Sequence, residues 1–236
     1  MKKAMLTAVI GLLMVSGSWG ARPLTTDDAG TLGSGAWEIE EGYELAQPKG
    51  GGNNSGSLGT ALKYGLLPNF DLGIEAPYSV SSPNGMGDAT VKGKLSFNEA
   101  AALGINVKLT NADAASGLGS GYMDCGINGI LSHGIGSVTL HLNLGYTIVG
   151  QAGGSNSENN IFSYAAAIEH PFNDRINLMA EIFGSSTPSL TTNPLDLLFG
   201  LNWALNDVFV LDGGLDLGLT DASSQYTAKT GVTVGL

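Results

Sequence analysis

The chain has 236 residues, a formal net charge of −11 and a single cysteine, Cys125. The acidic balance argues against a nucleic-acid partner, which needs basic patches, and one cysteine excludes an intramolecular disulfide framework and a cysteine-based metal cluster. Charged residues make up 13% of the chain, about half of the ~25% usual for a soluble domain, so a membrane environment has to be considered.

The first twenty residues have the pattern of a cleaved export signal. Two lysines precede an apolar run over 4–15, and small residues surround a cleavage site at 18–20. The run is too short to span a bilayer, and no later stretch reaches the ~20 apolar residues of a transmembrane helix. An exported chain with few charges and no helical span points to a β-barrel. We therefore expect a signal peptide over 1–20, an N-terminal periplasmic arm over 21–35 and a transmembrane barrel over 36–236.

After the arm, segments of about ten residues alternate between apolar and polar side chains, which is typical of strands. Twelve antiparallel strands are expected, an even number that brings both termini to one end of the barrel. They run approximately over 36–46, 57–66, 70–80, 88–97, 102–110, 122–132, 138–149, 161–170, 176–185, 195–205, 208–219 and 225–236.

The connections alternate in length. Every second connection is short, whereas the others are mostly longer and rich in Gly, Ser and Asn, as over 111–121 and 150–160. Outer-membrane barrels have short periplasmic turns and longer external loops. The alternation therefore predicts an all-β, closed, antiparallel up-and-down barrel, and it argues against a soluble sandwich.

Aromatic residues of the apolar face gather near the two ends of the strands, with Leu, Ile, Val and Ala between them. Phe183, on the charged face, and Phe199, at mid-strand, are exceptions. Two aromatic girdles fit the two interfaces of a bilayer, whereas a soluble core would place large rings at its centre. The last strand resembles the C-terminal assembly signal of such barrels, although it ends in Leu236 and not in an aromatic residue. We expect membrane lipid and the outer-membrane assembly machinery as partners.

Short glycine-rich motifs run through the mature chain: RPLTTDDAGTLGSGAWEIEEGYEL at its start, LKYGL at 62–66, GMGDATVKGKLSF at 85–97 and MAEIFG at 179–184. Together they resemble the outer-membrane β-barrel family of proposed transporters of the phenol meta-cleavage degradation pathway. The resemblance implies a small outer-membrane barrel with a role in uptake, and it leaves the solute open.

Charges concentrate on the polar face of the strands, which would line the lumen of a closed barrel. By side-chain parity this face carries twelve carboxylates and five lysines, whereas the opposite face carries Glu41 alone. An excess of carboxylates favours cations over anions in a water-filled passage. Alternatively, opposite charges pair and plug a narrow interior. The expected lumen and selectivity residues are Lys63, Asp71, Glu75, Asp88, Lys92, Lys94, Lys108, His141, Glu181 and Asp212. All of them except Lys108 and His141 are expected to bound the constriction.

An outer-membrane hydrolase is a rival class. His141 and Asn143 share a face, but no nucleophile stands in a distinctive context, so we expect His141 to act as a hydrogen-bonding residue of the lumen. No calcium-loop or phosphate-loop spacing is present, and no catalytic residue, cofactor or metal is expected. We expect a monomeric channel in the outer membrane of a Gram-negative bacterium for passive passage of small molecules, such as aromatic or other small organic solutes. A structural barrel with a plugged lumen is the alternative, and whether 21–35 enter the lumen is left open.

Overall fold

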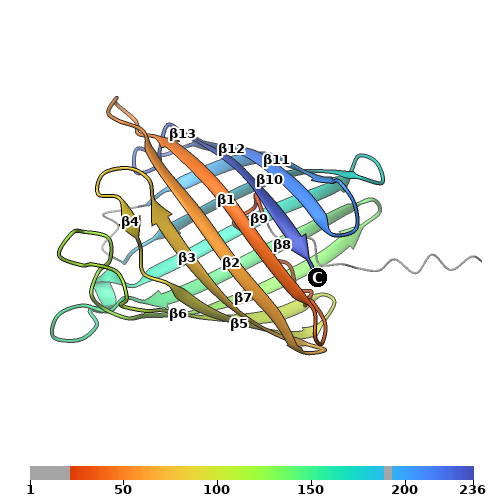
Figure 1. Ribbon diagram of the computed structural model, residues 1–236, viewed down its shortest axis with the longest axis horizontal. Coiled ribbons are helices and arrows are strands. Elements are labelled where there is room, and N and C mark those ends of the chain that lie inside the picture. Colours follow the sequence, from red (N-terminus) through yellow and green to blue (C-terminus); the bar gives the residue numbers. More distant parts are fainter. Residues whose placement is uncertain (1–21, 189–192) are drawn as a thin grey trace, which may run out of the picture.

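The computed structural model describes residues 22–188 and 193–236, and the expected signal peptide over 1–20 lies outside the described residues. Long strands tilt around a common axis (Figure 1). In chain order the strands are β1 (Trp37–Gln47), β2 (Ser55–Leu67), β3 (Phe70–Ser79), the two-residue β4 (Gly85–Met86), β5 (Thr90–Asn98), β6 (Ala101–Lys108), β7 (Asp124–Ile135), β8 (Val138–Ile148), β9 (Ile161–Pro171), β10 (Ile176–Ser186), β11 (Leu195–Ala204), β12 (Phe209–Gly218) and β13 (Tyr226–Gly235). A short 3₁₀ helix, η1 (Ser157–Asn159), precedes β9.

The strands close into a barrel through antiparallel pairing of chain neighbours and of the two ends. Strand β1 pairs with β2 on one side and with β13 on the other, from Glu38↔Gly235 to Gln47↔Tyr226. The predicted closed antiparallel barrel is therefore confirmed. Its long strands match the twelve expected segments to within a few residues at each end. We call the end with tight connections the short-turn end and the other the long-loop end; the C-terminus lies at the former (Figure 1).

In the described part of the chain, no helix is long and apolar enough to cross a membrane.

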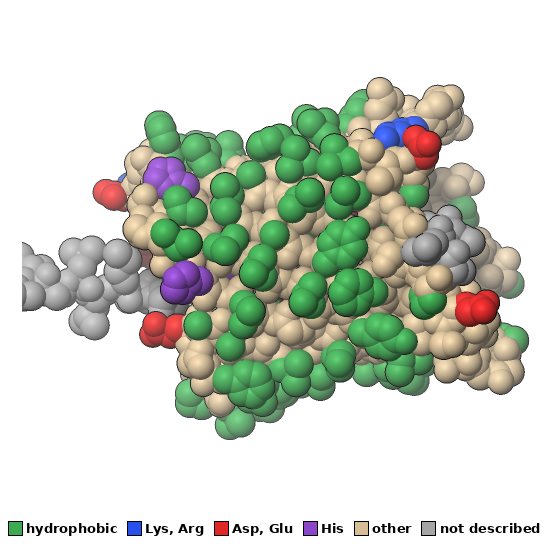
Figure 2. Space-filling model, turned by 180° about the vertical axis from the view of Figure 1, so that it is seen from behind, with side chains coloured by type: hydrophobic (Ala, Val, Ile, Leu, Met, Phe, Trp, Pro, Cys, Tyr) green, Lys and Arg blue, Asp and Glu red, His purple; other side chains and the backbone are tan. Residues whose placement is uncertain are grey.

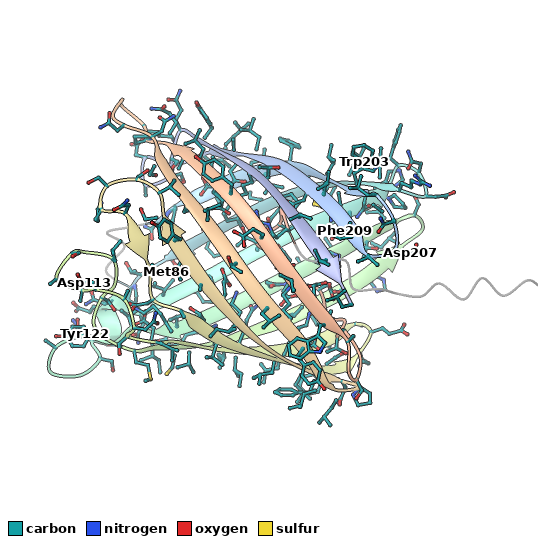
Figure 3. All side chains as sticks on the ribbon, in the orientation of Figure 1. Met86, Asp113, Tyr122, Trp203, Asp207 and Phe209 are labelled. Atoms are coloured by element: carbon teal, nitrogen blue, oxygen red, sulfur yellow. The ribbon has the colours of Figure 1, made fainter. Side chains whose placement is uncertain are left out.

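The outer wall of the barrel is apolar. Large side chains such as Ile127, Leu144 and Ile168 are about half exposed, because alternate residues of every strand point outward. Figure 2 shows hydrophobic side chains over the wall and acidic, basic and histidine side chains near its two ends. Trp203 and Phe209 lie at the short-turn end and Tyr122 at the long-loop end (Figure 3). Such a band, with rings toward both ends, fits the hydrocarbon core and interfaces of a bilayer.

One strand begins later than expected, and a short strand precedes it. The segment expected over 88–97 corresponds to β5, which pairs with β3 over Phe70–Glu75, and the additional strand β4 pairs with β3 at Tyr78 and Ser79. Asp88 therefore lies in the connection between β4 and β5 and not on a strand. The glycines and Pro83 around this connection disfavour a continuous strand, which explains the difference.

Candidate functional site: the lumen and its N-terminal arm

The arm over residues 22–35 lies inside the barrel. The sequence predicted a periplasmic arm over 21–35; the structure differs, because the backbone of residues 22–35 is hydrogen-bonded to lumen-facing side chains of several strands. Backbone polar groups of an irregular segment need partners, and the polar lumen provides them. The point that sequence analysis left open is thus answered for 22–35: they occupy the lumen.

Buried carboxylates on the wall hold the first half of the arm. The N–H groups of Thr25 and Thr26 donate to the Glu181 carboxylate of β10 at 2.8 and 2.7 Å, and the Thr26 hydroxyl donates to the same group. Arg22 Nε lies 3.6 Å from an Asp212 oxygen on β12. The arm is therefore anchored where two carboxylates face its donors, and hydrogen bonds to charged groups are stronger than neutral ones.

The middle of the arm binds β8, β7 and β5. Asp27 N–H donates to Asn143 Oδ1 at 3.0 Å, and Asn143 Nδ2 donates back to the Asp27 carbonyl at 2.8 Å. Ala29 N–H donates to Ser132 Oγ, 2.9 Å away. Lys94 of β5 pairs with the Asp27 carboxylate at 2.9 Å. These contacts hold the middle of the arm against one part of the wall, since β5 to β8 are consecutive in the sheet.

The last part of the arm returns to the wall beside β1. Leu32 N–H donates to both oxygens of Asp71 at 3.2 and 3.0 Å, and Gly35 N–H donates to the Gly65 carbonyl at 2.7 Å. The arm thus contacts strands around most of the barrel before it becomes β1.

Apolar contacts add to the polar ones. Leu24 packs against Ala167, Met179 and Leu198, which are inward-facing residues of β9, β10 and β11. Burial of one leucine side chain contributes roughly 1.5–3 kcal/mol. A second cluster joins Ala29 to Ala102 and Ile130.

Glycines of the wall make room for the arm. A Cβ atom on Gly42 of β1 would lie 1.9 Å from the Arg22 Cζ atom, so the guanidinium lies directly against this backbone. A Cβ on Gly65 would lie 1.7 Å from the carbonyl oxygen of Gly33. Larger residues at these inward positions would exclude the arm.

Every lysine on the described strands has an acidic partner. Lys63 pairs with Glu38 and Glu40, both at 2.9 Å, and Lys229 pairs with Asp216 at 2.9 Å. The other pairs are Lys92 with Glu75, Lys94 with Asp27 and Asp28, and Lys108 with Asp88 and Asp124. Acids and bases face each other across neighbouring strands, as in Glu38↔Lys63.

A cavity of about 400 Å³ remains beside the arm. Its charged lining includes Glu40 and Glu44 of β1, Glu75 of β3 and Lys92 of β5. Small inward residues such as Gly59 leave this space open. In the described residues Glu44 has no ion pair, so the cavity presents a carboxylate without a fixed basic partner. A second cavity, of about 180 Å³, meets the first at Thr25 of the arm.

Asp88 joins two loops at the long-loop end. Its carboxylate accepts hydrogen bonds from the Ala112 and Ser120 N–H groups at 3.0 and 3.1 Å, and Lys108 Nζ lies 3.7 Å away. Burial alone would raise the pKa of Asp88, but the two N–H donors and Lys108 outweigh it and hold the pKa below its ordinary value. Lys108 also pairs with Asp124 at 2.9 Å.

His141 lies between Ser132 and Glu169, and the three polar side chains form a row beneath the arm. Its Nδ1 atom lies 2.8 Å from Ser132 Oγ, and its Nε2 atom lies 3.6 Å from Glu169 Oε1. A nucleophilic serine needs a base and space for a substrate. Ser132 Oγ accepts the Ala29 N–H, and none of the three residues lines either cavity. The geometry assigns the row to holding the arm.

The ten predicted lumen residues fall into three groups. Those lining the larger cavity are Lys63, Asp71, Glu75, Lys92 and Lys94. Those against the arm include Glu181 and Asp212, with Asp71 and Lys94 belonging to both groups. His141 reaches the arm only through Ser132, which accepts the Ala29 N–H. Asp88 and Lys108 lie apart, at the long-loop end. The structure therefore does not bring the ten together at one narrow ring.

A family model described as "Putative MetA-pathway of phenol degradation" matches residues 21–236. The chain belongs to this family. The resemblance inferred from the sequence motifs is thereby confirmed. No curated protein matches the chain.

Solved structures share the fold of this family member. The COG4313 outer membrane channel from Pseudomonas putida F1 superposes with a TM-score of 0.69 at 12% identity, covering 90% of this chain and 100% of that one. The KdgM porin gives 0.59 at 10% identity, covering 84% and 98%. The CymD monoaromatic hydrocarbon channel gives 0.52 at 10% identity, covering 86% and 88%. At these identities the likeness concerns the barrel fold.

Several residues that hold the arm were not predicted from the sequence. Ser132 and the wall glycines Gly42 and Gly65 contact the arm but carry no chemical motif. A signal does exist, because Ile130 and Leu198 are apolar residues at inward positions of a polar lumen. Both are almost fully buried, at 1% and 0% exposure. An apolar side chain facing a lumen indicates that something covers it there.

Proposed function

We propose that this protein is an outer-membrane channel through which small molecules pass passively, without covalent chemistry. The observation that carries the proposal is a charged, partly hollow lumen inside a closed barrel whose outer wall is apolar. An apolar wall fits lipid, and a polar interior with cavities fits water and solutes. The barrel closes within a single chain, which supports a monomer as the working unit.

The arm limits what passes. It crosses the lumen and is held by carboxylates, amides and the Ser132 hydroxyl, so a solute has to move through the space beside it. The two cavities, of about 400 and 180 Å³, adjoin the arm. This space suits single small molecules, including small aromatic or other organic solutes, and excludes polymers.

Among ions, cations are expected to pass more readily than anions. The lumen lysines are all paired with carboxylates in the described chain, whereas Glu44 lines the larger cavity without an ion pair. Fixed negative charge in a low-dielectric wall raises the local concentration of cations.

Planar-bilayer recording in a KCl gradient tests whether the protein conducts and whether it prefers cations. The intact protein is expected to conduct with a reversal potential on the cation-selective side. Glu44→Gln should reduce this preference, whereas Glu41→Gln, the same change on the outward face of the same strand, should leave it unchanged. Unchanged selectivity in Glu44→Gln would contradict the assignment of Glu44.

A structural barrel with a plugged lumen is the second candidate, and the extensive contacts of the arm favour it. The same recording separates the two. A plugged barrel would be silent as the intact chain and would conduct only after removal of residues 22–35. Conductance by the intact chain supports the channel.

A further inference from the structure

Neutral polar residues line the smaller cavity around two glycines of the wall. Gly126 of β7 is the cross-strand partner of Asn106 on β6 and of Thr147 on β8. A Cβ atom on Gly126 would lie 2.6 Å from Asn106 Oδ1 and 2.8 Å from Thr147 Oγ1. Both side chains therefore lean over the glycine, and both line the cavity.

A second row with the same pattern lies one step along these strands. Gly145 of β8 is the partner of Asn128 on β7 and of Ser163 on β9. A Cβ on Gly145 would lie 2.2 Å from Ser163 Oγ and 3.6 Å from Asn128 Oδ1. Both polar side chains again line the cavity, with Gly145 between them.

We call these six residues the glycine cradle: Asn106, Gly126, Asn128, Gly145, Thr147 and Ser163. Gly145 lines the cavity, whereas Gly126 lies behind the Asn106 and Thr147 side chains that cover it. The four other residues of the cradle carry hydroxyl or amide groups.

The cradle has hydrogen-bonding capacity to spare. Asn128 Nδ2 donates to Asn143 Oδ1 at 2.9 Å. Within the described chain, the side chains of Asn106, Thr147 and Ser163 make no hydrogen bond. Amide and hydroxyl groups both donate and accept, so the cradle can bond to hydroxyl groups in either direction.

The lining of the smaller cavity differs from that of the larger one in charge, although Asn106 and Asn128 line both. Among the described residues that line the smaller cavity, none is Asp, Glu, Lys or Arg, whereas the larger cavity has acidic and basic residues. An ion entering a site without a countercharge loses hydration that nothing replaces, but a neutral hydroxylated molecule exchanges water hydrogen bonds for protein ones. Phe183 lies at the edge of the cavity and adds an apolar surface.

We propose that the glycine cradle binds neutral, hydroxylated solutes about the size of one six-membered ring. The inference deepens the proposed channel function, on which it rests, by naming a solute class that binds on its way through the lumen. The volume of about 180 Å³ fits one such ring and not a chain of them.

The test compares three probes with the same ring: glucose, glucosamine, which is cationic at neutral pH, and glucuronate, which is anionic. Binding is measured on the purified full chain in detergent micelles by saturation-transfer NMR titration, which does not require conduction. Glucose is expected to bind, and the two charged probes are expected to bind at least about tenfold more weakly, because the cradle has no countercharge.

Variants then locate the site. The double variant Thr147→Val with Ser163→Ala removes two hydroxyls with little change in volume and should weaken glucose binding about tenfold or more. Gly126→Ala would displace the Asn106 and Thr147 side chains that lie over this glycine and should weaken glucose binding as well. Gly59→Ala, which adds the same methyl group on the lumen side of β2 in the larger cavity, is the matched control and should bind like the parent.

Three outcomes would overturn the inference: no glucose binding, equal binding of a charged probe, or glucose binding that the double variant leaves unchanged. If Gly126→Ala fails to fold, the double variant still decides. A protein that conducts but does not bind glucose refutes the cradle alone. A protein that binds glucose but never conducts refutes the channel and leaves the cradle as a binding site.

Discussion

Glu181→Gln is the sharpest test of how the arm is held. Glu181 is 1% exposed, and its carboxylate accepts the N–H groups of Thr25 and Thr26 and the Thr26 hydroxyl. The amide of glutamine keeps one acceptor oxygen and turns an NH₂ group toward an N–H that previously had a partner. The substitution therefore removes the charge and leaves at least one donor of the arm opposed by another donor.

The size of the effect follows from the bonds lost. A hydrogen bond to a charged group contributes about 1.5–3 kcal/mol, and leaving a buried donor unsatisfied costs about 1–3 kcal/mol. We expect docking of the arm to weaken by roughly 3 kcal/mol, which corresponds to about a hundredfold larger undocked fraction. Local opening of this kind is reported by amide hydrogen exchange.

Hydrogen exchange with mass spectrometry on peptides covering 22–35 measures the effect. Asp196→Asn is the matched control, because it makes the same change of charge in a lumen carboxylate that contacts Ser223 and not the arm. We expect exchange in 22–35 to accelerate about a hundredfold in Glu181→Gln and to stay unchanged in Asp196→Asn. Equal protection in Glu181→Gln and the parent would refute the view that this carboxylate anchors the arm.

Three further substitutions test the lipid-facing wall, the contact of Gly65 with the arm, and the loops around Asp88. Phe199→Arg, at mid-strand on the outer wall, should lower the free energy of unfolding in lipid by about 2–4 kcal/mol. Phe172→Arg, in a short turn, is the control and should change it little. Equal urea unfolding curves for the two variants would contradict a lipid-facing wall. Gly65→Ala should displace the end of the arm, because the new methyl group would overlap the Gly33 carbonyl. Unaltered amide hydrogen exchange over 30–35 would contradict the contact between Gly65 and the arm. The pKa of Asp88 is lowered in the fold, so its contribution to loop stability is complete above the ordinary aspartate pKa of about 4 and is lost only as the pH falls below it. Loop proteolysis should therefore be constant from neutral pH to about pH 5, while Asp88→Asn should accelerate it throughout this range; a steep change between pH 7 and 5 would disprove the assignment.

The barrel was predictable from the sequence because its determinants are local and periodic. A period of two decides which side chains face lipid, and one break in parity, such as that around Leu67 and Phe70, marks a turn. Even so, the short strand β4 was missed and Asp88 was wrongly placed on a strand, since Asp88 has the parity of a strand residue and its partners lie on a distant loop.

The lumen was predictable in composition but not in arrangement. Parity placed Glu181 and Asp212 in the interior, yet nothing in their neighbourhood in the sequence indicates that they bind an arm more than a hundred residues away. The arm itself is as polar as any exposed terminus. Its position depends on long-range complementarity between N–H groups, carboxylates and glycine gaps, which a single sequence does not reveal.

Arg22 stands at the seam where the first and last strands meet. Its side chain lies against Gly42 of β1, its Nη2 atom donates to the Thr230 carbonyl of β13 at 3.3 Å, and its Nε atom faces Asp212 of β12. The Arg22 side chain thus contacts three adjacent strands from inside the barrel. Placing the arm in the lumen therefore adds contacts across the junction that closes the sheet.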